Sequence, residues 1–285
     1  MSAGPAGGDV TASGGTGPAS GRAAPASGRA APARFGPRPF VTIVGVTARS
    51  VLSRRRTLLV LLFVAAPVLL ALLARAVGAD SEATPNVIAI ALGDALILHV
   101  VLPIVALLFG TAVIGAEIDD GTIVYLLSKP VPRWEIVLAK LLVAEAVTLA
   151  LLVPMTLATS LIVLAGAPGA DLEIVAGSTV AVAVGAIVYV AIFVAMSVLT
   201  SRALVLGLAY VLIWEGFLAS LFAGTRNLSV REYAVSIGGW IAGQNLADTE
   251  PIAVGFAAGL AVAVTVIAVA ITIRTLGSFE VKDGG

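Results

Sequence analysis

Residues 174–200 read IVAGSTVAVAVGAIVYVAIFVAMSVLT, a run without one charged side chain. A helix needs about 20 predominantly apolar residues to cross a bilayer, so this run predicts a membrane-spanning helix. The whole chain shares this character, because 59% of its 285 residues are hydrophobic and 12% are charged. Soluble domains average about 45–50% and about 25%. The sequence therefore predicts an integral membrane protein.

Five further apolar runs have the length of a span, so we expect an all-α protein with six transmembrane helices. The predicted spans cover about residues 57–76, 93–116, 139–165, 174–200, 203–223 and 252–273. Pro67, Pro103 and Pro154 lie inside spans and predict kinks, since packed neighbours can satisfy the carbonyls that a proline frees.

The distribution of Lys and Arg predicts the orientation, because short cytoplasmic flanks carry an excess of these residues. An even number of spans places both termini on one side. With the termini inside, the outer flanks hold only Arg75, Arg226 and Arg231. The inner flanks hold the larger set, namely Arg38, Arg49, Arg54, Arg55, Arg56, Lys129, Arg133, Lys140, Arg202, Arg274 and Lys282. We therefore expect a multi-pass protein of the cell membrane with cytoplasmic termini.

The region before the first span divides into two parts. Residues 1–37 are rich in Gly, Ala, Pro and Ser and repeat SGRAAPA, so they predict a disordered tail ahead of a membrane domain at 38–285. Residues 39–56 place Phe40, Val44, Ala48 and Val51 at helical spacing before three arginines. This pattern favours a helix on the inner leaflet, and a plain positive-inside signal is the alternative.

The loop between the second and third spans concentrates charge. Residues 110–142 read GTAVIGAEIDDGTIVYLLSKPVPRWEIVLAKLL, and Glu117, Asp119, Asp120, Lys129 and Arg133 fall between two apolar runs. Two prolines interrupt the segment and predict a turn. A short element of mixed charge suits docking to a cytoplasmic partner. The same residues also suit a loop that only enforces topology.

The same stretch resembles the permease subunits of type-2 ABC transporters. In that family a Glu near the end of span two precedes a Gly-Thr turn, a short helix and a Pro-x-x-Arg-like segment. The matching residues here are Glu117, Gly121, Thr122, Lys129, Pro130, Pro132 and Arg133. A second stretch, YVLIWEGFLASLFAGTRNLSVREYAV at 210–235, is similar to actinobacterial members. The likeness covers roughly residues 38–280.

The resemblance implies a permease subunit of an ATP-driven exporter. Two permease copies, identical or related, would form the pathway, and two separate ATP-binding subunits would dock on a coupling helix at about 117–133. A P-loop needs a Gly-Lys pair, and Lys129, Lys140 and Lys282 follow Ser, Ala and Val. We therefore expect no enzyme activity or cofactor on this chain, with ATP and Mg²⁺ on the partner. The zero net charge argues against a nucleic-acid partner.

Four polar residues fall inside predicted spans: Asp94, His99, Glu145 and Glu215. Burying such groups is expensive, so each is a candidate for function. For Glu215 we favour a structural hydrogen bond between spans. A proton relay through these residues would instead make the chain a proton-coupled secondary transporter, which is the alternative function. A single His and the lack of HExxH argue against a metal site or a metalloprotease. A purely structural membrane protein stays open, and the cargo is not readable from these residues.

Overall fold

The computed structural model describes residues 54–77, 84–119, 132–165, 171–218, 228–247 and 249–278, and these ranges contain helices and no strand. The helices are α2 (Arg54–Val77), α3 (Pro85–Ala91), the π-helix η2 (Leu92–Val101), α4 (Leu102–Asp119), α6 (Arg133–Leu164), α7 (Leu172–Leu199), α8 (Ala203–Ala209), the π-helix η3 (Tyr210–Leu218), α10 (Val230–Ala242) and α11 (Val254–Ser278). The all-α class is thus confirmed for these ranges. The predicted tail at 1–37 lies outside the described residues, as does the surface helix at 39–56 except for its last three residues.

Five described helices are long and apolar enough to cross a membrane: Val60–Val77, Pro85–Gly115, Trp134–Leu164, Leu172–Leu199 and Val254–Leu276. They match five of the predicted spans. Of the remaining one, expected at 203–223, the structure describes an apolar helix over Ala203–Gly216, and residues 219–223 lie outside the described residues. The described helices therefore support five of the predicted spans by length and composition.

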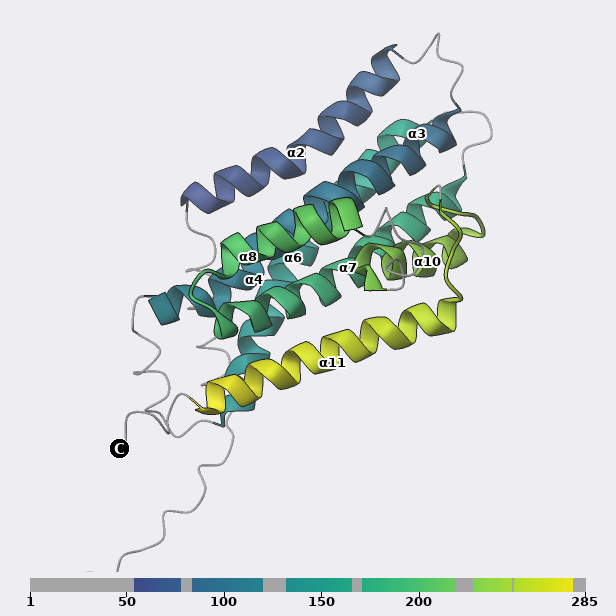
Figure 1. Ribbon diagram of the computed structural model, residues 1–285. Helices are drawn as coiled ribbons and strands as arrows, with labels where there is room; N and C mark the ends of the chain where they lie inside the picture. Colours follow the sequence, from purple (N-terminus) through teal and green to yellow (C-terminus); the bar gives the residue numbers. More distant parts are fainter. Residues whose placement is uncertain are drawn as a thin grey trace, which may run out of the picture. The chain divides into compact units, whose positions relative to one another are not determined.

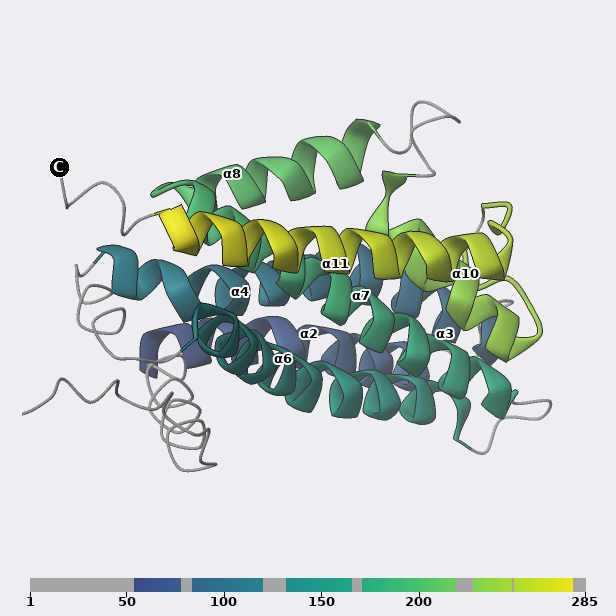
Figure 2. The same cartoon turned by 90° about the horizontal axis from the view of Figure 1, so that it is seen from below.

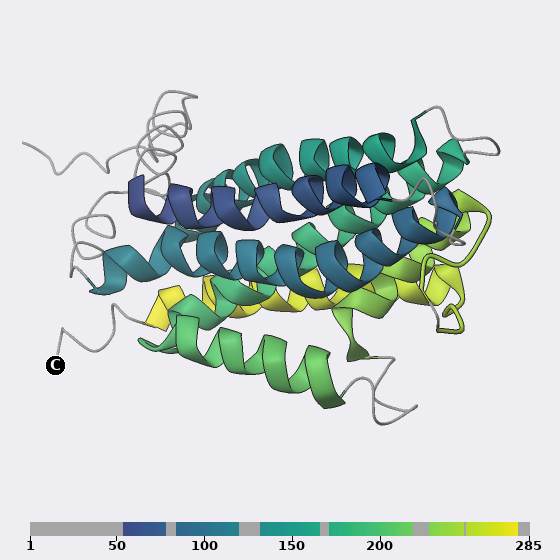
Figure 3. The ribbon, with the colours of Figure 1, turned by 90° about the horizontal axis from the view of Figure 1, so that it is seen from above.

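Helix α7 is the centre of the bundle, with α4, α6, α10 and α11 packed on it (Figure 1). Within the apolar windows, 67% of α7 is buried, against 17% of α2 and of α11. Figures 2 and 3 show α11 running along α7 and α2 running along α6. Helices α2 and α11 therefore form the periphery of the described bundle.

Helix α10 packs more closely on α7 than any side chain would allow at two positions. A Cβ added to Gly177 would lie 2.5 Å from the carbonyl oxygen of Gly238, and one added to Gly238 would lie 2.5 Å from that of Gly177. The contact continues at Gly185, two turns after Gly177 in α7, which lies against Ala234, one turn before Gly238 in α10. Helix α10 thus runs antiparallel to the first half of α7, and its first turns lie beside the middle of that helix.

Gly110 of α4 also lies close to α7, since an added Cβ would be 3.2 Å from the Val190 carbonyl oxygen. Two glycines of α11 lie in open surroundings. The pair Gly255 and Gly259, whose spacing allows close approach of two helices, has no described atom within 4 Å of an added Cβ at either position. Gly243 ends α10 with φ at 65°, a left-handed conformation that glycine adopts without strain.

The prolines leave their helices continuous. Pro67 and Pro154 lie within the unbroken α2 and α6. Pro103 lies at the second residue of α4, directly after the π-helix η2. The spans with internal prolines are therefore not broken at those residues, as expected for helices packed against neighbours.

Candidate functional site

A polar cluster surrounds the first turn of α10, in the interior of the bundle. Ser229 is the N-cap, and its side-chain oxygen accepts a hydrogen bond from the backbone N–H of Glu232. Ser229 and Glu232 form the Ser-x-x-Glu pattern of a capping box. The side chains of Ser229 and Glu232 are both buried. A helix start inside an apolar bundle needs acceptors for its free N–H groups, and the cluster supplies them.

Glu215, from η3, is one of these acceptors. Its side chain is 4% exposed. Its carboxyl oxygens accept hydrogen bonds from the Ser229 hydroxyl at 2.6 Å and from the Val230 N–H at 2.9 Å. The Tyr210 hydroxyl donates a third bond at 3.3 Å. The predicted structural hydrogen bond of Glu215 is therefore present, and it joins η3 to the positive end of the α10 dipole.

Asp94, from η2, binds Arg231, the residue that follows Val230 in α10. Both of its carboxyl oxygens accept hydrogen bonds from the Arg231 guanidinium, in an ion pair with about one seventh of each side chain exposed. Arg231 also pairs with Glu232 at 2.8 Å, and the Thr249 hydroxyl donates to Glu232 at 3.2 Å. One guanidinium nitrogen, Nη2, thus serves both oxygens of Asp94 while Nη1 serves Glu232, and such charge-assisted bonds are stronger than neutral ones. Two separate helical segments, η2 and η3, therefore bind the first turn of α10.

The two acids lie in the two π-helical segments, η2 and η3. In η3, Tyr210 and Glu215 are five positions apart and are joined by a hydrogen bond. In an α-helix residues five apart point about 140° away from each other, whereas a π-helix, with its i to i+5 bonds, brings them close. The π geometry of η3 therefore brings Tyr210 to Glu215.

An aromatic column backs the cluster on the α7 side. Tyr189, fully buried, stacks on Phe193 with ring centroids 5.9 Å apart, and Phe193 meets Tyr210 edge-on at 6.3 Å. The Tyr189 hydroxyl is close enough to interact electrostatically with Glu215. Tyr233, which a position at the outer interface would expose, is instead 1% exposed in α10. Large rings of this kind limit the positions that Tyr210 can take.

Glu145 stands apart from this cluster. It lies in α6, and its side chain is 9% exposed. Its Oε2 atom has no hydrogen-bond partner, and neither has the buried hydroxyl of Thr148 one turn further on. The structure thus brings Asp94 and Glu215 to the first turn of α10, and Glu145 does not join them. His99 lies in η2, five positions after Asp94.

Of the predicted docking residues, the structure describes only the flanks. Helix α4 ends at Asp119 and α6 begins at Arg133, so Glu117 and Asp119 lie in the last turn of α4. Asp120, Gly121, Thr122, Lys129 and Pro130 lie outside the described residues. Lys140, 1% exposed, donates to the Val113 carbonyl at 2.9 Å. This bond fastens the two helices together just behind the loop.

Sequence reasoning missed Ser229, Arg231, Tyr210 and Tyr189 as members of the cluster. The capping-box pattern at 229–232 was the available signal, because it predicts a helix that begins at Ser229. Within the described residues no three of His, Cys, Asp and Glu are grouped so that they could hold a metal ion. The hydrogen bonds of the cluster can therefore anchor the first turn of α10.

A family described as "ABC-2 family transporter protein" matches residues 47–283 of this chain. The match includes every described helix. Comparison with curated proteins gives no match.

Proposed function

The chain belongs to the ABC-2 family of transporter proteins and is a membrane subunit of an ABC transporter, and on that premise we propose that it is the permease subunit of an ATP-driven exporter. The family match confirms the resemblance to type-2 ABC transporter permeases. Membership also implies an ATP-binding partner subunit. Export, the docking surface and the actinobacterial likeness are parts of the proposal.

The observation that carries the proposal is that Asp94 and Glu215 bind the first turn of α10, Asp94 by an ion pair and Glu215 by a hydrogen bond. A purely structural bundle gains little from a charged helix start in its apolar interior, because such groups are costly to bury. In a transporter, a short helix held by a few polar bonds can close a path on one side and be released on the other. Alternating states of this kind need an element with two arrangements.

The proposed topology has six spans: α2, α3 with η2 and α4, α6, α7, α8 with η3, and α11. Helix α10 then occupies only the outer half of the membrane, next to the first half of α7. Both termini and the loop at about 117–133 lie in the cytoplasm. Two permease copies, or this chain and a related one, form the pathway among membrane lipids.

We further propose that the ATP-binding subunit docks on residues 117–133, chiefly through Glu117, Asp119, Asp120, Lys129 and Arg133. Support comes from the rigid base of this segment, since Lys140 ties α6 to the end of α4. A force applied to the loop would therefore reach both helices. ATP and Mg²⁺ would be bound on the partner.

The test is a pull-down from native membranes in mild detergent, with a tag on the N-terminal segment. We expect an ATPase with a P-loop to co-purify, and the triple change Glu117→Lys, Asp119→Lys and Asp120→Lys to release it. The matched control is Glu173→Lys, an exposed acid at the opposite end of the bundle, which should retain the ATPase. If no ATPase accompanies the folded wild-type chain, the docking proposal is wrong.

A proton-coupled transporter stays the second candidate because of Glu145, a buried carboxyl with an unpartnered oxygen. Asp94 and Glu215, by contrast, already have hydrogen-bond donors in the structure. Transport that dissipates with the proton gradient and persists without ATP would favour this candidate.

A further inference from the structure

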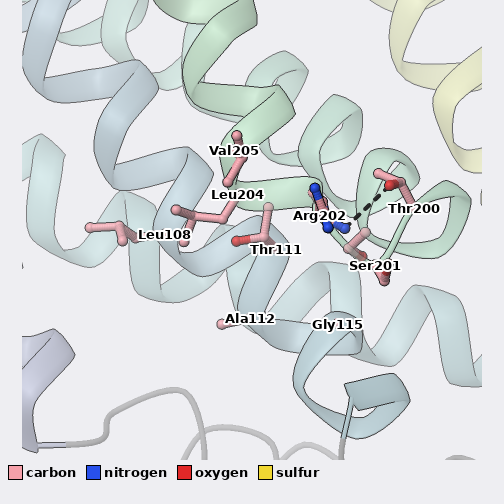
Figure 4. Close-up of a pocket in the computed structure, with 11 residues that line it drawn as sticks. Leu108, Thr111, Ala112, Gly115, Thr200, Ser201, Arg202, Leu204 and Val205 are labelled. Atoms are coloured by element: carbon pink, nitrogen blue, oxygen red, sulfur yellow. Dashed lines mark hydrogen bonds between the residues drawn. The ribbon is translucent and has the colours of Figure 1, made fainter.

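A small pocket opens between the end of α4 and the start of α8, at the end of the bundle opposite α10 (Figure 4). Its volume is about 250 Å³. Sites for drug-sized ligands measure roughly 300–1,000 Å³. The pocket therefore suits one polar group of a larger molecule, with the remainder lying outside.

The rim of the pocket consists of hydrogen-bond donors. Arg202 and Ser201 are exposed and lie in the turn between α7 and α8, beside Thr200. The Thr200 side-chain oxygen accepts the Arg202 backbone N–H at 3.2 Å, so the hydroxyl hydrogen is left to donate elsewhere (Figure 4). Deeper in, the hydroxyls of Thr111 and Ser197 donate to carbonyls of their own helices. The rim thus offers a cation and two hydroxyl donors.

The charge of this rim is not balanced within the described part of the chain. None of the described residues that line the pocket is acidic. The salt bridges among the described residues involve Arg231 in the first turn of α10, and no described acid pairs with Arg202. A guanidinium with hydroxyl groups on either side recognises a phosphate or a carboxylate.

The opposite wall and the surface beyond it are apolar. Leu108 and Ala112 come from α4, and Leu204 and Val205 come from α8. Leu204, Leu208 and Leu212, all exposed, continue from the pocket along the same helix toward the middle of the bundle. A hydrocarbon chain attached to a group in the pocket would lie on this strip, within the apolar part of the membrane that the proposed topology gives it.

We propose that this pocket binds the anionic head group of an amphiphile, whose apolar chain lies along Leu204, Leu208 and Leu212. The ligand class is a phosphate- or carboxylate-bearing lipid, either resident in the leaflet or carried as cargo. The proposed topology is needed only to assign the pocket to the inner leaflet of the membrane. Binding itself does not depend on the ATP-binding partner.

The test uses the isolated full chain in nanodiscs of equal parts phosphatidylglycerol and phosphatidylcholine, with retained lipid measured by native mass spectrometry. We expect the wild type to retain phosphatidylglycerol preferentially. Arg202→Gln should lower that retention about five- to tenfold, because the charge-assisted hydrogen bonds of the guanidinium to the head group are lost. Thr111→Leu, which fills the pocket from α4, should lower it as well. The control Arg274→Gln, an exposed arginine near the same end of α11, should stay within twofold of wild type.

Several results would overturn the proposal. One is equal retention by the wild type and Arg202→Gln, both eluting as monodisperse protein. Another is an equal loss in Arg274→Gln, which would mean unspecific attraction of anionic lipid. A third is a loss of the ATPase in the pull-down of Arg202→Gln with lipid retention unchanged, which would assign the rim to a protein partner.

A second arm separates the two sources of the ligand. In proteoliposomes that contain both subunits, a fluorescent phosphatidylglycerol that leaves the inner leaflet when ATP is added is cargo. One that stays bound through turnover is a resident lipid. Either result supports the site, and failure of the pull-down leaves the nanodisc measurement intact.

Discussion

At the scale of a residue, substitutions of Glu215 distinguish two roles of this carboxyl, a structural acceptor for the start of α10 and a member of a proton relay. Leucine at this position removes the acceptor of the Ser229 hydroxyl and of the Val230 N–H in an apolar interior. We expect Glu215→Leu to lower the free energy of unfolding by about 2–4 kcal/mol, since each unsatisfied buried group costs about 1–3 kcal/mol. Glu215→Gln keeps an acceptor oxygen and loses about 1 kcal/mol of charge–dipole stabilisation. Thermal unfolding of the purified variants in detergent measures both.

Transport activity supplies the control for this pair. Glu215→Gln should transport at a rate close to the wild type, because an anchor needs an acceptor and no proton exchange. Full inactivation by Gln in a protein that still unfolds near the wild-type temperature would show that the anchor is not the whole role of Glu215.

Glu145 leads to the opposite prediction. Its Oε2 atom is buried without a partner, and a polar group in that state costs about 1–3 kcal/mol. We expect Glu145→Met to stabilise the protein by about 1 kcal/mol, visible as a higher midpoint of thermal unfolding. Thr148→Val, which removes the other unpartnered group of α6, is the matched variant. Loss of transport in a stabilised Glu145→Met protein would strengthen the proton-coupled alternative.

The acids themselves could be predicted from the sequence, because a charged residue in an apolar run stands out without any structure. Their partners could not. Asp94 and Arg231 are 137 positions apart, and local patterns carry no information about contacts at that separation. The pair of Tyr210 with Glu215 was hidden for a second reason. A helical period of 3.6 places residues five apart on different faces, and the π-helical segment η3 brings these two together.

At the scale of an element, the contact between α7 and α10 leaves no space for a side chain. We expect Gly238→Leu to push α10 away from α7, because an added Cβ would lie 2.5 Å from a backbone oxygen. Overpacking of this kind costs about 1–3 kcal/mol or more. Gly255→Leu is the control, since its Cβ would meet open space within the described bundle. Unfolding midpoints of the two variants should differ clearly, and equal midpoints would contradict the close packing.

Helix α10 was the element that sequence reasoning handled least well. Residues 224–251 were expected as an outer segment, and their sequence is too short and too polar for a span. The Ser229 capping box and Gly243 mark the two ends of the helix, so its bounds could be predicted from the sequence. Its position was not, since Gly177 and Gly238 can meet only once the pairing of the two helices is known.

At the scale of the whole molecule, the orientation can be tested with single cysteines, because the chain contains none. Asn245→Cys and Ser201→Cys are exposed positions at opposite ends of the bundle. With cytoplasmic termini, an impermeant maleimide should label Asn245→Cys in intact cells and Ser201→Cys only after permeabilisation. Ser178→Cys, at a buried position, should stay unlabelled until the protein is denatured. Labelling of Ser201→Cys in intact cells would reverse the proposed topology.

The positions of the long apolar helices could be predicted, because the length of an apolar run is a local property of the sequence. Five predicted runs are long helices in the structure. Which helix would be central could not be predicted. The apolar windows of α2, α7 and α11 have mean hydropathies of 2.5, 2.6 and 2.5, yet 17%, 67% and 17% of them are buried. Lipid and protein interior are equally apolar surroundings, so hydropathy does not distinguish the helix inside the bundle from the two at its edge.

The buried start of α10 also bears on how the chain is made. With 13 residues, α10 is too short to enter the bilayer as an independent segment, and its first turn carries Arg231 and Glu232. The acceptors for that turn come from Asp94 and Glu215, which are synthesised earlier and must already be packed around α7. We therefore expect α10 to reach its place only after those partners have folded around α7, because its 13 residues are too few to span the bilayer alone.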